Sequence, residues 1–310
     1  MSFAAPVDSV HVRAPGKINV YLGVGGRHDD GYHALATVFQ AVSLYEDVIA
    51  RHADDFSITV SGVDDPDSVP LDDRNLAMRA AKLLATAAEY DGGVALEIRK
   101  SVPVAGGMGG GSADAAAALV ACDALWGTGF STARLHELGA RLGADVPFAL
   151  HGGTAVGTGR GDQLSPALAR GRFDWVLVQS DEGLSTPVVY ARLDTLRDDE
   201  GALADDPPLS LEVPAPVLQA LRSGDPDLLA ESIYNDLQEA ALYERPELET
   251  TILRGIHAGA LQGIVSGSGP TVALLCASPE GAQTVQSLLR EHGLESLHVH
   301  GPVQGARIIS

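Results

Sequence analysis

The feature of this sequence that most constrains its fold is a glycine-rich segment, PVAGGMGGGSAD, at residues 103–114. The alternating stretch at residues 94–100 predicts a β-strand before it, and the alanine-rich stretch at residues 112–126 predicts a helix after it. Five of the six residues at 106–111 are glycines, which allow backbone conformations that other residues rarely adopt. Successive N–H groups can therefore face one anion, at the point where the helix dipole adds partial positive charge.

Two common phosphate-binding motifs are absent from this segment. No lysine follows the glycines as a GxxxxGK[ST] loop requires, and a GxGxxG pattern that begins at Gly107 meets Ser112 in place of its last glycine. The alternative is a hinge or tight turn with Ser112 as an ordinary helix N-cap. The density of glycines just before a strong helix favours an anion-binding loop. Ser112 then either caps the helix or turns its hydroxyl toward a phosphate or Mg²⁺.

The length and the order of elements predict an α+β fold of two layered domains. A chain of 310 residues is comfortable for two domains that share a cleft. Strands are predicted at 10–24, 37–50, 56–60, 94–100, 263–266, 271–276 and 296–300, and helices at 75–90, 112–126, 131–142, 187–196, 250–260 and 280–292. Pro15 divides the first strand into two around a tight bend, and Asp72 or Asp73 is the expected N-cap of the first helix. The domain boundary is placed near Gly171, giving domains 1–171 and 172–310.

Composition narrows the class of protein. The formal net charge of −20 argues against a nucleic-acid partner, which normally requires a basic patch. Cys122 and Cys276 lie in apolar runs and are interpreted as buried, reduced thiols. The N-terminus carries no signal-peptide pattern, and no apolar run has the length of a membrane span. We therefore expect a cytoplasmic protein without a membrane partner, either a monomer or a homodimer.

Three motifs in order identify a family resemblance. They are APGKIN at residues 14–19, PVAGGMGGGSADAAAAL at residues 103–119, and SGSGPT at residues 266–271. Together they resemble the motifs of the GHMP kinases. The resemblance implies a two-domain GHMP kinase fold, with an N-terminal domain like domain 2 of ribosomal protein S5 and a layered α/β C-terminal domain. It also implies transfer of the terminal phosphoryl group of ATP to an alcohol, with Mg²⁺ as the cofactor and no protein ligands assigned to the metal.

Further segments resemble one branch of these kinases. The branch pattern runs from Lys17 and Asn19 to Gly-Tyr-His at 31–33 and Phe-Gln at 39–40, and includes LGADVPF at 142–148. The resemblance implies phosphorylation of the 2-hydroxyl of 4-diphosphocytidyl-2-C-methyl-D-erythritol in the non-mevalonate route to isoprenoid precursors. Another GHMP kinase, acting on homoserine or a mevalonate derivative, is the nearest alternative. A non-catalytic nucleotide-binding protein on the same fold is the second.

The resemblance also implies the ATP-binding residues. They are Pro103, Val104, Ala105, Gly106, Gly107, Met108, Gly109, Gly110, Gly111, Ser112 and Ala113. The loop at 266–271 is either a second N–H-rich loop beside the phosphates or a hairpin turn.

Three departures from the branch pattern stand out. The chain has His28 and Asp29 after Arg27, where the branch often has a second basic residue, and this leaves a substrate-side charge unassigned. Ala113 replaces a frequent serine and removes one hydroxyl contact to phosphate. The acidic, proline-rich stretch at 198–208 has no counterpart in the branch.

Asp145 and Lys17 are the candidate catalytic residues. Phosphoryl transfer to an alcohol needs an acceptor for the hydroxyl proton and cations that offset developing charge. The residues alone favour Asp145 as the N-cap of a helix that begins at Val146; the resemblance favours a general base, and both roles are compatible. Lys17 is expected to hydrogen-bond Asp145 and keep it ionised, unless it is an exposed lysine at a strand end. Asn19 shares its strand face and would position Lys17 or the substrate.

Tyr32, His33 and Phe39 are the candidate substrate-binding residues. Tyr32 and His33 follow Asp29-Asp30-Gly31, which is a turn signal. A ring and an imidazole on a turn can stack on a base and read its polar edge, and the resemblance implies cytosine. Phe39 is either a second apolar wall for the base or part of the core, and Tyr32 also has core packing as its alternative.

Overall fold

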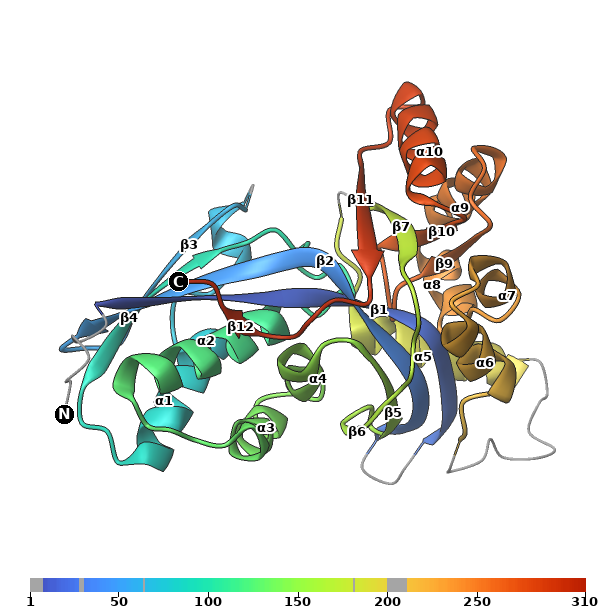
Figure 1. The fold of residues 1–310 in the computed structure, drawn as a ribbon. Coiled ribbons are helices and arrows are strands. Elements are labelled where there is room, and N and C mark those ends of the chain that lie inside the picture. Colours follow the sequence, from blue (N-terminus) through green and yellow to red (C-terminus); the bar gives the residue numbers. More distant parts are fainter. Residues whose placement is uncertain (1–7, 28–30, 64, 181, 200–210) are drawn as a thin grey trace.

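Two long antiparallel strands, β1 (Ser9–Arg27) and β2 (His33–Ala53), run through the centre of the molecule (Figure 1). The computed structural model describes residues 8–27, 31–63, 65–180, 182–199 and 211–310. The predicted break at Pro15 is wrong, because β1 continues through it. The register against β2 shifts between Pro15 and Gly16. A bulge of this kind accommodates a residue without an N–H donor and leaves one continuous strand.

These two strands organise the first sheet. Its order is β12-β1-β2-β4-β3, with β5 beside β2, β6 beside β5, and β8 beside β1. The further strands are β3 (Ser57–Ser61), β4 (Gly93–Arg99), β5 (Thr154–Gly159), β6 (Gln163–Pro166), β8 (Tyr234–Asn235) and β12 (Arg307–Ile308). Because β8 and β12 come from the second half of the chain, that half closes onto the first sheet. The boundary near Gly171 stays a prediction.

Helices cover one face of the first sheet (Figure 1). They are α1 (Leu76–Ala88), α2 (Gly110–Trp126), α3 (Thr132–Ala140) and α4 (Val146–His151), and a 3₁₀ turn, η1 (Pro66–Ser68), precedes them. Asn75 caps α1 by accepting the N–H of Ala77, so the predicted Asp72 or Asp73 cap is wrong. Asp72 is occupied by the backbone and side chain of Arg74. The helix α2 begins two residues earlier than predicted, with Gly109 at its N-cap in place of Ser112.

The second sheet has the order β11-β7-β10-β9 and belongs to the second half of the chain. Its strands are β7 (Phe173–Val178), β9 (Gln262–Val265), β10 (Val272–Cys276) and β11 (Ser296–Gly301). The helices of this half are α5 (Thr186–Asp199), α6 (Ala215–Ser223), α7 (Pro226–Ala230), α8 (Gln238–Glu244), α9 (Glu247–His257) and α10 (Pro279–Glu291). Mainly antiparallel sheets with helices packed on their faces confirm the predicted α+β class.

A shared core joins the two halves. Ile18 and Val38, on β1 and β2, pack in one buried cluster with Trp175 and Leu177 of β7. The Trp175 indole N–H also donates to Gln40 Oε1 at 3.0 Å. A buried indole usually finds such a partner, because an unpaired N–H is costly away from water. Gln40 of the Phe-Gln pair therefore holds the second sheet against the central strands.

Both cysteines are buried and free, as predicted. Burial raises the pKa of both thiols. Within the described ranges, no helix combines the length and the hydropathy that a membrane span requires.

Candidate active site

The three sequence motifs meet at the glycine loop between β4 and α2. The backbone N–H of Lys17 on β1 donates to Met108 O at 3.0 Å, and the Lys17 ammonium donates to Gly107 O at 2.9 Å. On the other side, a Cβ on Gly107 would lie 2.4 Å from Ser266 O. Only glycine permits this approach of the loop to the third motif, and its φ of +74° also favours glycine.

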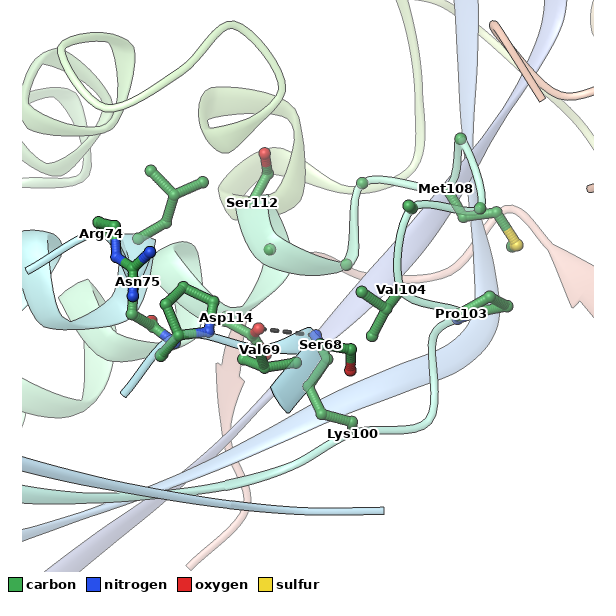
Figure 2. A pocket seen from close by; sticks show the side chains of 18 residues that line it. Ser68, Val69, Arg74, Asn75, Lys100, Pro103, Val104, Met108, Ser112 and Asp114 are labelled. Atoms are coloured by element: carbon green, nitrogen blue, oxygen red, sulfur yellow. Dashed lines mark hydrogen bonds and ion pairs between the residues drawn. The ribbon is translucent and has the colours of Figure 1, made fainter. Parts of the chain in front are cut away.

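A cavity of about 380 Å³ lies along the glycine loop (Figure 2). Residues 103–112 form one side of it, and Ser68, Val69, Arg74 and Asn75 lie on the opposite side. Of the predicted ATP-binding residues, Ala113 does not line the cavity, because it is fully buried in α2. The wall at residues 68–76 was not predicted. It comes from the loop before α1, which carries no recognisable motif.

The start of α2 opens toward this cavity without a side-chain cap. Gly109 is the N-cap, with φ of +71°, and makes no side-chain capping bond. The first N–H groups of a helix have no partner inside the helix, and they carry the positive end of its dipole. Ser112 stands in the first turn of α2 and lines the cavity, so its hydroxyl is a polar group on that wall.

A buried charge cluster lies beneath the loop. The Lys100 ammonium is 2.7 Å from Glu46 Oε1 and 2.7 Å from Asp114 Oδ2, and the side chains are at most 4% exposed. Burial raises the pKa of Glu46 to about 8, assisted by the charge of Asp114 and opposed by that of Lys100. Burial also raises the pKa of Asp114. A Cβ on Gly110 would lie 3.0 Å from Glu46 Oε1, so the cluster occupies the space of a side chain there.

Sequence reasoning missed this cluster, although it left a signal. Asp114 is the only charged residue in the alanine run at 112–121, where every neighbour on a buried helix face is apolar. A charge in such a place normally has a partner.

A second cavity, of about 290 Å³, contains the predicted catalytic pair. Asn19 Oδ1 accepts a 2.7 Å hydrogen bond from the Lys17 ammonium, and Asn19 Nδ2 donates to Thr37 Oγ1 at 2.8 Å. The chain of bonds continues from Thr37 to Tyr21 O at 2.7 Å. Lys17 is therefore held in place by residues of β1 and β2. Asn19 was predicted to position either Lys17 or the substrate, and it contacts Lys17. Burial lowers the pKa of Lys17, and the charge of Asp145 opposes that effect.

The expected hydrogen bond between Lys17 and Asp145 is not formed. No hydrogen bond or ion pair joins the two side chains, and both lie beside Gly109. A Cβ on Gly109 would lie 3.4 Å from Lys17 Cγ and 3.7 Å from Asp145 Oδ2. The Lys17 ammonium has turned instead to Asn19 and Gly107, whose oxygens are closer.

Asp145 occupies the N-cap position of α4 but makes no side-chain capping bond. Its φ of −85° and ψ of −11° are helical, whereas a capping side chain normally needs an extended backbone at this position. The position expected from the sequence is therefore correct and the capping bond is absent. The carboxylate faces the second cavity and can serve chemistry there.

A third cavity, of about 460 Å³, holds Tyr32 and His33. Tyr32 is 57% exposed at its rim, with the Arg160 guanidinium carbon 4.1 Å from the ring centroid. The His33 side chain is only 6% exposed, and Nε2 lies 2.7 Å from Asp194 Oδ1 on α5. The ring of Tyr190 packs against it, 5.1 Å between centroids. Tyr32 thus faces the open cavity, while the imidazole is engaged by α5.

Phe39 does not line the third cavity. It is 4% exposed, packs on Phe148 with 5.1 Å between ring centroids, and borders the second cavity beside Lys17. The Lys17 ammonium lies 5.5 Å from the centroid of the Phe39 ring. Phe39 is therefore a core residue that supports Lys17, and Tyr190 of α5 takes the place expected for a second aromatic wall.

The three cavities follow one another. Gly107 and Gly109 border both the first and the second cavity. The second and third share Leu35, Arg160, Thr186 and Tyr190. A phosphate donor in the first cavity and an elongated acceptor through the second and third would meet at Lys17 and Asp145.

Comparison with known proteins identifies the class. The family model described as "GHMP kinases N terminal domain" matches residues 75–153, and "GHMP kinases C terminal" matches residues 217–294. A solved homoserine kinase from Cytophaga hutchinsonii shares the fold, with a TM-score of 0.74 at 20% identity over 100% of both chains. The chain belongs to the GHMP kinases, and the two-domain fold implied by the resemblance is confirmed.

Similar proteins narrow the class to one branch of the GHMP kinases. A 4-diphosphocytidyl-2-C-methyl-D-erythritol kinase of Arthrobacter sp. (strain FB24) is 57% identical over 97% of this chain and 95% of its own. One of Leifsonia xyli is 55% identical over 98% of this chain and 100% of its own. A crystal structure of 4-(cytidine 5'-diphospho)-2C-methyl-D-erythritol kinase has a TM-score of 0.75 at 31% identity, covering 94% of this chain and 98% of that one. The predicted branch of the family is thereby confirmed.

Proposed function

We propose that this protein transfers the γ-phosphoryl group of ATP to the 2-hydroxyl of 4-diphosphocytidyl-2-C-methyl-D-erythritol, producing ADP and the 2-phosphate. The reaction belongs to the non-mevalonate route to isoprenoid precursors. The observation that carries the proposal is the continuous series of three cavities, with Lys17 and Asp145 at the middle one. The names of the relatives support the same substrate.

ATP occupies the first cavity. The N–H groups of the glycine loop and of the first turn of α2 bind its phosphates, and the dipole of α2 favours their negative charge. The γ-phosphate lies at Gly107 and Gly109, which border the second cavity as well. The adenosine part extends toward the wall at residues 68–76.

Mg²⁺ fits this site as an ion that arrives on the nucleotide. No group of three or more His, Cys, Asp or Glu side chains able to hold a metal occurs in the described part of the chain. Mg²⁺ is usually bound by substrate phosphates, waters and one or two protein oxygens, and the hydroxyl of Ser112 is such an oxygen. When bound, the ion offsets the charge that develops on the phosphate oxygens.

Asp145 accepts the proton of the acceptor hydroxyl. At the same time, the hydroxyl oxygen bonds to the γ-phosphorus and the bond between the γ-phosphorus and ADP breaks. The Asp145 carboxylate is suited to this role because it makes no capping bond. The Lys17 ammonium, held by Asn19 and Gly107 O, stabilises negative charge on the transferring group. Cytidine occupies the third cavity, where the exposed Tyr32 ring can stack on the base.

The test is release of ADP by the purified protein with ATP, Mg²⁺ and 4-diphosphocytidyl-2-C-methyl-D-erythritol, beside homoserine, mevalonate and galactose. We expect turnover with the cytidyl substrate alone, because the other alcohols leave the third cavity empty. Turnover of another alcohol, without turnover of the cytidyl substrate, would overturn the substrate assignment. Binding of ATP without turnover of any alcohol would favour a non-catalytic nucleotide-binding protein. A cytoplasmic location, and a monomer or homodimer, stay predictions.

A further inference from the structure

The acceptor proposed above carries two phosphates between its base and its reacting alcohol. A ligand with its base in the third cavity and its hydroxyl beside Asp145 must place this diphosphate where the two cavities join. The residues that border both are Leu35, Arg160, Thr186 and Tyr190. Among these, Arg160 is the cation. The other cations of the described residues here are Lys17, at the reacting end, and Arg27, at the far end near Asp194.

The fold places Arg160 at this junction through the register of two strands. Leu35 of β2 pairs with Gly159 of β5, so the residue after Gly159 lies beside the segment that carries Tyr32 and His33. The turn that follows is built around two glycines in the left-handed region, Gly159 at φ +69° and Gly161 at φ +87°. Asp162 Oδ1 accepts the N–H of Arg160 at 3.2 Å and closes the turn.

We propose that Arg160 binds the diphosphate of the acceptor and thereby selects an alcohol linked to a nucleoside diphosphate. The inference rests on the proposed function and names a residue that positions and selects its substrate. A guanidinium presents a planar set of N–H donors that match phosphate oxygens in pairs. The guanidinium carbon lies 4.1 Å from the centroid of the Tyr32 ring, and Arg160 lines both the second and the third cavity.

This assignment supplies the charge that the sequence left open. The branch often has a second basic residue directly after the position of Arg27, where this chain has His28. Here a cation reaches the same cavity from Arg160, more than a hundred positions further along the chain. The other polar side chain at the junction, Thr186, is held by Ser268 Oγ at 2.8 Å and adds no charge.

The competing explanation is that Arg160 only holds the Tyr32 ring in place. The two roles differ in which ligand, cytidine or CDP, loses affinity when Arg160 is replaced. The experiment measures binding of cytidine and of CDP by calorimetry, with the first cavity filled by a non-hydrolysable ATP analogue and Mg²⁺. In Arg160→Gln we expect the affinity for CDP to fall about 10- to 100-fold, as for loss of charge-assisted hydrogen bonds. The affinity for cytidine should change less than about threefold, since cytidine lacks the diphosphate. Arg160→Lys should lie between the two, because it keeps the charge and loses the paired donors.

Equal losses for cytidine and CDP would overturn the proposal in favour of a brace for Tyr32, and unchanged affinities would overturn it outright. Arg160 is exposed, so its replacement is not expected to disturb folding. The matched control is Arg134→Gln, which removes the same charge from an exposed arginine on α3 outside the three cavities. A loss of CDP affinity in this control would assign the effect to net charge and contradict a direct contact.

The same data separate this inference from the function beneath it. If the wild-type protein binds neither cytidine nor CDP and does not phosphorylate the cytidyl alcohol, the proposed function is wrong. Wild-type protein that does both, with a ratio of CDP to cytidine affinity unchanged in Arg160→Gln, would remove only the role of Arg160.

Discussion

The two ends of the cavity series are built in different ways. At the nucleotide end, one continuous segment at residues 103–112 supplies most of a wall, largely with backbone groups. At the other end, side chains from β1, the residue before β2, β2 itself, the turn after β5 and α5 converge: Arg27, Tyr32, His33, Arg160, Tyr190 and Asp194. Backbone recognition depends on glycines close together in sequence, whereas side-chain recognition depends on contacts between distant segments. The first kind is therefore visible in a sequence and the second is largely hidden.

The largest effect is expected where the two ends meet. Asp145→Asn should lower kcat by about 10²- to 10⁴-fold, the usual contribution of a general base, with little change in KM for ATP. Thermal unfolding should be nearly unchanged, because the carboxylate makes no capping bond to lose. Steady-state kinetics with both substrates and a melting curve decide this. Near-normal turnover would show that another group takes the proton.

A single added methyl group in the glycine loop should disturb the end of the cavity series that is built from backbone groups. Gly107→Ala should raise KM for ATP about tenfold or more, because its Cβ would lie 2.4 Å from Ser266 O and its φ is +74°. Gly127→Ala is the control, since φ there is +64° and a Cβ would have no atom within 4 Å. It should cost about 1 kcal/mol of stability and leave KM for ATP unchanged. Equal KM values in both variants would mean that the loop tolerates the displacement.

The buried cluster beneath the loop predicts a dependence of stability on pH. The pKa of Glu46 is raised to about 8 in the folded state, above its ordinary value of 4.5, so the folded protein holds a proton that the unfolded chain releases. The stability contributed by this group therefore falls as pH rises between these values, by at most about 1.4 kcal/mol per pH unit.

Glu46→Gln should reduce that slope, because its amide does not titrate. Urea unfolding between pH 5.5 and 8.5 measures the slope in both proteins. The control is Glu97→Gln, in which an exposed pair with Arg99 and Arg51 is lost and the slope should persist. A slope that is the same with and without Glu46 would place the exchanged proton elsewhere.

The smallest effect is expected at the side-chain end. Asp194→Asn weakens the 2.7 Å contact with His33 Nε2, and should raise KM for the cytidyl alcohol about 3- to 10-fold, with kcat and KM for ATP retained. Asp198→Asn, on the exposed face of the same helix, should leave all three parameters unchanged. A change in KM for ATP as large as that for the alcohol would indicate that the contact supports the whole site.

The sequence correctly predicted a glycine loop between a strand and a helix, and it predicted the arrangement of the side chains along the other cavities only in part. Lys17 and Asn19 were correctly paired, because residues two apart on a strand share a face. The sequence left Phe39 open between a wall for the base and the core, because an apolar residue on a strand has the same pattern in both cases. The structure packs it on Phe148. The capping role of Asp145 failed because the helical backbone at that residue keeps the side chain from the N–H groups.

By itself, the sequence determined what depends on local order: the α+β class, the glycine loop before α2, and the positions of Lys17, Asn19 and Asp145. Only the tertiary structure decided which side chains from distant segments meet. It brought Glu46 and Asp114 to Lys100, Asp194 to His33, and Arg160 to Tyr32. Burial and ion pairing act over a few ångströms in space whatever the separation along the chain, so these contacts exist only once the sheets and α5 have packed.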